Sequence, residues 1–129
     1  MTLKESHLII VKRILRYLKV TDHLCLFYPY ECPFYLVGYT NIDYAKCTID
    51  RKSTSGMAQF LGPCLISWAS RKQEIVALST TEAEYVAAAS YCAQLLWLKQ
   101  QVSDYDLTYE SIPILCDNTS AINISKNPV

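Results

Sequence analysis

The chain has 129 residues, of which 51% are hydrophobic and 19% charged, so it is long enough for one domain with a core and too apolar for a disordered protein. Its 12 basic and 12 acidic residues balance, which excludes a global positive field that would attract nucleic acid. Six cysteines without a C-x-x-C pair, and only two histidines, argue against a zinc site and a disulfide scaffold. We expect reduced cysteines, no membrane partner, and an intracellular location in the cytoplasm or the nucleus.

Residues 6–19 are predicted to form an amphipathic helix, because apolar residues such as Leu8, Val11 and Leu15 recur at helical spacing. Four basic side chains share the opposite face: Lys12, Arg13, Arg16 and Lys19. This face fits a solvated surface of a packing helix, and it also fits a surface that contacts phosphates. Residues 23–28 are predicted to form a short strand, closed by Pro29 and Pro33.

Residues 34–42 are predicted to form a buried strand, because they are rich in β-branched and aromatic residues. Side chains alternate along a strand, so Tyr39, Asn41 and Asp43 share one face at its carboxyl end. An amide and a carboxylate at the end of a buried strand suit a polar site. Asn and Asp also favour an ordinary strand-terminating turn, and this alternative stays open.

Two more strands are predicted after a polar loop, at residues 57–61 and 64–69, with Gly62 and Pro63 as the turn between them. Strands with such short connections form an antiparallel meander. Residues 70–73 are predicted to form a basic loop that leaves the last of these strands.

The longest apolar stretch, residues 83–98, is predicted to form a helix that is apolar nearly all round and therefore buried. At about 100° per residue, Glu84 shares a face with Ala87, Tyr91 and Leu95. A carboxylate on an apolar face is costly unless it is paired, hydrogen-bonded or bound to a metal. The role of Glu84 is therefore the central question that this helix raises.

Two capping boxes compete for the start of this helix. In one, Thr81 pairs with Glu84, which then has only a local role. In the other, Ser79 pairs with Glu82, and Glu84 is left free one turn into the helix.

Residues 112–116 are predicted to form a short apolar strand, and a tight turn and a helix follow at residues 121–124. Asp117 then lies at the carboxyl end of the strand, where open α/β sheets tend to place ligands. Asp117 or Asn118 also fits the N-cap of the helix that follows.

The predicted element order is β-β-β-α-β-α, an α/β fold with a mixed sheet. In this order the end of the first strand, the first turn of the long helix and the end of the fourth strand can meet at one edge. Clustered carboxylates repel one another unless a cation neutralises them, and hard oxygen ligands suit Mg²⁺ or Mn²⁺. Carboxylates that hold two such ions can drive attack of water on a phosphodiester.

Five ordered segments carry a family resemblance: residues 37–45 (VGYTNIDYA), 50–56 (DRKSTSG), 66–73 (ISWASRKQ), 76–85 (VALSTTEAEY) and 114–122 (ILCDNTSAI). With them the chain resembles the ribonuclease H domain of copia-type LTR retrotransposon Pol polyproteins. The resemblance implies two regions. Residues 1–33 are a linker from the reverse transcriptase region, with the amphipathic helix and the short strand, and residues 34–129 are a ribonuclease H-like domain truncated before its last strand and helix.

The resemblance also implies two Mg²⁺ or Mn²⁺ ions on four carboxylates, and cleavage of the RNA strand of an RNA–DNA hybrid. Glu84 matches the second acidic position and Asp117 the third, whereas Asn41 stands at the first and the fourth falls beyond Val129. Asp43 lies on the same predicted face as Asn41, about 6.6 Å further along the strand. Misplacement by about 1 Å can already cost about a hundredfold in rate, so we expect weak or no nuclease activity.

Three hypotheses follow. The chain is a degraded ribonuclease H fragment of a Pol polyprotein, or a working nuclease in which Asp43, Glu84 and Asp117 are the catalytic and metal-binding residues. In the third, it is a non-catalytic module that grips RNA–DNA hybrid through basic residues, namely Arg51, Lys52, Arg71 and Lys72. In each case, reverse transcriptase and other Pol domains are the expected protein partners.

Overall fold

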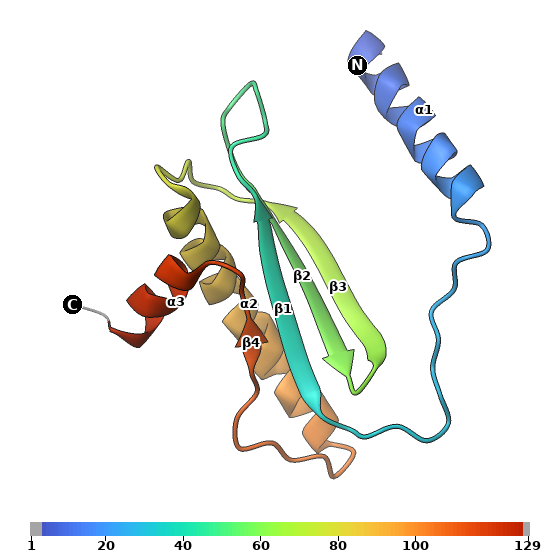
Figure 1. Cartoon of the computed structure of the whole chain (residues 1–129), viewed down its shortest axis with the longest axis vertical. Coiled ribbons are helices and arrows are strands. Elements are labelled where there is room, and N and C mark those ends of the chain that lie inside the picture. Colours follow the sequence, from blue (N-terminus) through green and yellow to red (C-terminus); the bar gives the residue numbers. More distant parts are fainter. Residues whose placement is uncertain (1–3, 128–129) are drawn as a thin grey trace.

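A three-stranded antiparallel meander forms the body of the sheet. In the computed structural model, which describes residues 4–127, β1 spans Leu36–Asp43, β2 spans Thr54–Leu61 and β3 spans Cys64–Lys72 (Figure 1). β2 pairs antiparallel with β1 and with β3, as predicted. The basic loop predicted at residues 70–73 is wrong for most of its length. These residues continue β3 because the start of β2 gives them a partner strand, with Thr54 opposite Lys72.

The fourth strand, β4 (Ile114–Leu115), pairs parallel with β1, and the sheet order is β3-β2-β1-β4. β4 is shorter than the predicted strand at residues 112–116. Pro113 has no N–H for a ladder, although its carbonyl oxygen accepts a hydrogen bond from the Gly38 N–H at 3.0 Å. The sheet is therefore mixed, as predicted, and the α/β order of elements agrees with the sequence analysis.

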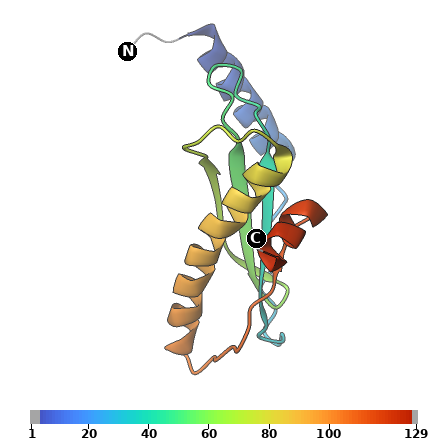
Figure 2. The same cartoon turned by 90° about the vertical axis from the view of Figure 1, so that its left-hand side faces the viewer.

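The long helix, α2 (Thr80–Ser103), lies across one face of the sheet (Figures 1 and 2). Its buried residues fall on the predicted face and include Glu84, Tyr91 and Leu95. The prediction that this helix is buried all round is wrong, since Trp97 is 56% exposed. In the described part of the chain, the sheet and the last helix cover part of α2 and leave the surface around Trp97 exposed.

Gly38 is the point where α2 and β1 approach each other. A Cβ atom at this position would collide with the ring and the hydroxyl of Tyr91. Tyr91 is fully buried in the resulting gap, and its hydroxyl donates to the Ala58 carbonyl oxygen at 3.3 Å. The missing side chain of Gly38 therefore seats the middle of α2 on the sheet.

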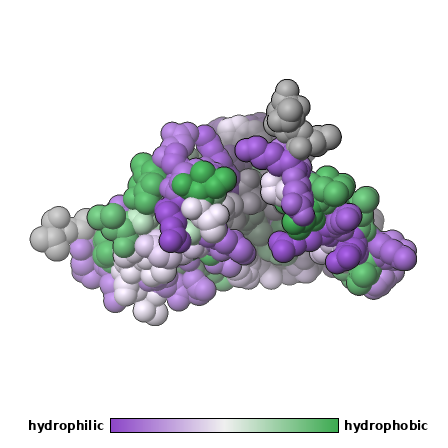
Figure 3. Space-filling view, turned by 90° about the horizontal axis from the view of Figure 1, so that it is seen from above, coloured by the Kyte–Doolittle hydropathy of each residue, from purple (hydrophilic) through white to green (hydrophobic). Residues whose placement is uncertain are grey.

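The amphipathic helix predicted near the amino terminus is present as α1 (Glu5–Val20), but none of its 16 described residues is buried. Figure 1 shows it apart from the sheet, and in Figure 3 its hydrophobic side chains reach the surface beside its polar ones. The strand predicted at residues 23–28 is wrong. This segment has no strand because no neighbouring strand pairs with it in the described residues.

The last described helix, α3 (Thr119–Lys126), packs against α2 and ends at its C-cap, Asn127. None of the helices described within residues 4–127 combines the length and the apolar character that a membrane span requires.

The close approach at Gly38 predicts a specific cost of adding a methyl group there. We expect Gly38→Ala to lower the free energy of unfolding by about 1–3 kcal/mol, because Tyr91 must move out of its place. Gly56→Ala is the matched control on the adjacent strand, since a Cβ there meets only the Asn41 carbonyl oxygen at an ordinary 3.7 Å. Urea denaturation of both variants measures the difference. Equal losses for the two would contradict this account of helix seating.

Candidate metal-binding site at the edge of the sheet

Glu84 is free of the capping role that its position allowed. Ser79 is the N-cap of α2, and its hydroxyl accepts a hydrogen bond from the Glu82 N–H at 3.1 Å. The Glu82 carboxylate in turn accepts from the Leu78 N–H at 2.7 Å. Ser79 is thus the N-cap, as the second of the two predicted boxes requires, but the box is incomplete because the Glu82 carboxylate accepts from Leu78 and not from the N–H of Ser79. Glu84 is left one turn into the helix, 4% exposed and directed at the sheet.

Asp117 is free in the same way. Asn118 is the N-cap of α3, and its side-chain oxygen accepts from the Ala121 N–H at 3.0 Å. Asp117 is exposed and lies two residues beyond the end of β4. The parallel pairing of Leu115 with Tyr39 brings this strand end beside the carboxyl half of β1.

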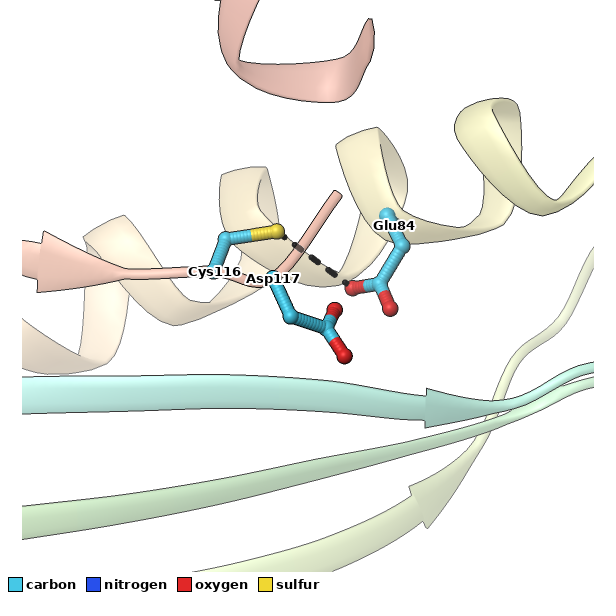
Figure 4. Close-up of side chains that lie close together, drawn as sticks. All are labelled: Glu84, Cys116 and Asp117. Atoms are coloured by element: carbon cyan, nitrogen blue, oxygen red, sulfur yellow. Dashed lines mark hydrogen bonds between the residues drawn. The ribbon is translucent and has the colours of Figure 1, made fainter. Parts of the chain in front are cut away.

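The carboxylates of Glu84 and Asp117 point into the same space beside β1 (Figure 4). Cys116 completes the group, and one ligand atom from each of the three residues lies within 4.8 Å of the others. The Cys116 thiol donates to the Glu84 carboxylate over an Sγ–Oε2 distance of 3.8 Å. Cys116 was not among the predicted site residues, although its position immediately before Asp117 at a strand end was a usable signal.

Burial and the neighbouring negative charge both act on Glu84. Burial raises the pKa of the Glu84 carboxyl above its ordinary 4.5, and the charge of Asp117 raises it further. The Cys116 thiol and the backbone N–H of Ile42 offset part of this increase. Burial likewise raises the pKa of the Cys116 thiol, so this sulfur is held in its neutral form. The ionised form of Glu84 is therefore disfavoured here, and a bound cation would offset that cost.

Asn41 is connected to this group by the backbone N–H of Ile42. The Ile42 N–H donates to the Asn41 side-chain oxygen at 2.7 Å, and the same N–H is directed toward Glu84. Asp43 is not part of the group. Its carboxylate is half exposed and pairs with Lys46 at 2.9 Å. The structure thus brings Asn41, Glu84 and Asp117 to one edge, while Asp43 turns to a neighbouring lysine.

These residues fit one divalent cation and do not fit two. Glu84 and Asp117 supply two carboxylates, which is a set that Mg²⁺ or Mn²⁺ accepts together with water. The Cys116 thiol is held neutral and would have to lose its proton to act as a third ligand, and its soft sulfur suits Mn²⁺ better than Mg²⁺. A second cation would need a further carboxylate, and Asn41 offers only a neutral amide.

The four basic residues predicted to bind nucleic acid lie at the same end of the sheet as this group. Arg51 and Lys52 are in the loop between β1 and β2, while Arg71 and Lys72 end β3. Two of them form ion pairs. Arg71 pairs with Glu74 at 3.2 Å between exposed side chains.

Lys72 contacts Asp50 at 2.6 Å, and this ammonium group lowers the pKa of the Asp50 carboxyl. Arg51 is exposed and has a φ of 57°, and Lys52 is half-buried. The binding role of all four residues stays a prediction.

A mixed sheet in the order β3-β2-β1-β4, with a helix across one face and carboxylates at the strand ends, is compatible with a ribonuclease H-like fold. The relatives of the chain are transposon proteins. It is 42% identical over 123 residues to the retrovirus-related Pol polyprotein from transposon TNT 1-94 of Nicotiana tabacum. It is 36% and 35% identical over 126 residues to the retrovirus-related Pol polyproteins from transposons RE1 and RE2 of Arabidopsis thaliana.

These alignments cover 95% of the chain for the tobacco relative and 97% for the other two. They cover only 9% of each relative, so the chain corresponds to a small part of those polyproteins. The chain is thus homologous to one part of retrovirus-related Pol polyproteins from transposons. Neither a protein-family model nor a solved structure matches it.

The raised pKa of Glu84 predicts that the folded state loses stability as the pH rises. The unfolded chain releases this proton near pH 4.5, whereas the folded chain holds it to a higher pH, so stability falls across that interval. In the presence of a chelator, we expect Glu84→Gln to be more stable than the parent at pH 7 and to differ little below pH 4.5. Thermal denaturation from pH 4 to pH 7 measures this.

The matched control is Glu110→Gln, which removes an exposed carboxylate at a distance from the group. Its stability should follow the parent profile across the same range. Parallel profiles for the parent and Glu84→Gln would show that the Glu84 carboxyl has no raised pKa.

Proposed function

We propose that the chain is a ribonuclease H-like domain of retrotransposon origin. Its ancestral activity is hydrolysis of the RNA strand of RNA–DNA hybrids during reverse transcription. The observation that carries this proposal is the buried Glu84 carboxylate, which faces Asp117 at the edge of a sheet of the expected order. The homology to transposon Pol polyproteins supports it independently.

In this proposal Glu84 and Asp117 hold one Mg²⁺ or Mn²⁺ ion. Such an ion, when bound, polarises a phosphoryl oxygen and makes a nearby water more acidic. The two side chains fix its place, because Glu84 is immobilised by burial and Asp117 follows the paired strand β4. Asn41 accepts the Ile42 N–H at the position where the resemblance expects a third anion.

The same geometry supports our expectation of weak or absent cleavage. The neutral Asn41 leaves the group one negative charge short. In this proposal Asp43 does not replace that charge, because its carboxylate is directed to Lys46, which it contacts at 2.9 Å. We therefore assign Glu84 and Asp117 to the proposed site. A catalytic role of Asp43 would require its ion pair with Lys46 to open.

A second candidate function is non-catalytic binding of the same hybrid. It is favoured by a groove of about 500 Å³ between β3 and α2, whose lining includes Arg71 and Lys72. These residues are at the same end of the sheet as Glu84 and Asp117, so a duplex bound there would extend across the acidic group. In a Pol polyprotein, reverse transcriptase and the other Pol domains would be the neighbours of such a module.

The substitution Asn41→Asp tests the proposed nuclease origin. We expect the parent chain to cut a labelled RNA–DNA hybrid weakly or not at all in Mn²⁺, and Asn41→Asp to cut it faster by on the order of a hundredfold. Adding Glu84→Gln to this variant should abolish the gain. A gel assay of the labelled RNA strand measures all three proteins.

The control for the added charge is Asn123→Asp, which places the same carboxylate on an exposed turn of α3. It should cut no faster than the parent. If Asn41→Asp behaves like this control, or if the parent cuts at a rate that Glu84→Gln does not change, the proposed site is wrong.

The binding proposal is tested by the salt dependence of hybrid affinity. We expect the double variant Arg51→Gln, Arg71→Gln to bind hybrid more weakly at low salt. The slope of log affinity against log salt should fall by about 2, one for each lost phosphate contact. The double variant Lys12→Gln, Arg13→Gln on α1 removes the same charge and should retain the parent slope. If the slope of log affinity against log salt falls only in the α1 variant, the phosphate contacts are made by α1 and not by Arg51 and Arg71.

A further inference from the structure

The segment that joins α1 to β1 is held against the turn between β2 and β3. The Tyr28 hydroxyl donates to the Leu65 carbonyl oxygen at 2.7 Å, and the Gly62 N–H donates to the Tyr35 carbonyl oxygen at 2.7 Å. A Cβ atom at Gly62 would collide with the Pro33 carbonyl oxygen. This segment is therefore in close contact with the sheet, although α1 itself is not.

Two cysteines meet within this contact. The Sγ atoms of Cys32 and Cys64 are 3.9 Å apart, although the residues are 32 positions apart in the chain. Cys64 is the first residue of β3 and is buried, whereas Cys32 is half-buried in the joining segment. All six cysteines of the chain are free thiols in the structure.

We propose that Cys32 and Cys64 form a reversible oxidation site, which closes to a disulfide and fixes the joining segment to the start of β3. The two sulfur atoms must approach from 3.9 Å to about 2.0 Å, a movement that side-chain rotation and small shifts of the joining segment can supply. The site is distinct from the Glu84 group and does not depend on the proposed nuclease origin.

The oxidant that the proposal requires is a small-molecule disulfide such as oxidised glutathione. The Cys32 thiolate attacks one sulfur of glutathione disulfide, because Cys32 is the more accessible partner, and one glutathione thiolate leaves. The Cys64 thiolate then attacks the Cys32 sulfur, and the second glutathione leaves. The protein loses two protons and two electrons, and two glutathione thiols are formed.

The geometry favours completion of the second step over accumulation of glutathione on Cys32. Burial of Cys64, together with the adjacent Cys32 thiol, raises the pKa of the Cys64 thiol, so this residue is a poor first nucleophile. Once Cys32 carries glutathione, however, the Cys64 sulfur is already in contact with the bond it must attack. The disulfide would fix the path of the chain between α1 and the sheet.

The test uses the full chain in glutathione buffers of increasing oxidised fraction, followed by alkylation under denaturing conditions and mass spectrometry. We expect a mass loss of about 2 Da, with one linked peptide pair that contains Cys32 and Cys64. We also expect the oxidised chain to melt at a temperature higher by on the order of 10 °C, because the bond closes a long loop.

Two variants make the outcome decisive. In Cys64→Ser the 2 Da loss should disappear, and Cys32 should keep a bound glutathione. If this variant folds poorly, Cys32→Ser replaces it, and the 2 Da loss should disappear there as well. Cys92→Ser removes an exposed thiol of α2 and should leave the linked pair unchanged. The proposal is overturned if the parent keeps glutathione on Cys32. It is also overturned if Cys32 and Cys64 remain reduced in buffers that oxidise the exposed Cys25 and Cys92.

Discussion

The packing of Tyr91 against Gly38 is the contact on which the rest of the structure depends. Gly38 lies on β1 and has α2 on one side through Tyr91 and β4 on the other through its pairing with Ile114. Glu84 precedes Tyr91 by seven residues, which is about two turns, so it faces the same side of the helix. The seat of Tyr91 thereby places Glu84 beside the end of β1. The pairing at Gly38 places Asp117 there as well.

The charges at this edge of the sheet then determine whether it can bind a cation. Two carboxylates and a thiol meet where the resemblance implies a larger set of anions, and burial makes the charge on Glu84 costly. One cation would relieve this cost, whereas a second would lack ligands. In the proposed ribonuclease H-like origin, Glu84 and Asp117 are the part of the site that remains, and Asn41 stands where the resemblance implies a carboxylate. Weak activity of this kind would require no change in the core.

Much of this arrangement could be predicted from the sequence, and the exceptions have physical causes. The strands and the buried face of α2 follow from local periodicity, which is strong there. Whether Glu84 or Glu82 takes part in the cap could not be predicted, because both boxes satisfy the same local rule. Only the geometry at Ser79 decides between them. The position of Asp43 could not be predicted, since it depends on an ion pair with Lys46. Cys116 was suggested by its place before Asp117, but its contact with Glu84 depends on packing between β4 and α2.

The exposed apolar residues of α1 and of the far side of α2 show that composition alone does not predict which residues are buried. Residues such as Leu15 and Trp97 have the character of core residues, but burial depends on what lies against them. The disagreement is therefore about tertiary contacts and not about secondary structure. It leaves the group at the edge of the sheet unaffected, because that group depends on β1, β4 and the first turn of α2.

The most direct measurement of the central claim is paramagnetic broadening of backbone amide signals by Mn²⁺ in an NMR titration. We expect the signals of Ile42, Glu84 and Asn118 to broaden first and together, because all three residues lie around the space between the carboxylates of Glu84 and Asp117. Broadening that begins instead at Asp104 and Asp106, beyond the far end of α2, would show that the edge of the sheet is not where this chain binds a divalent cation.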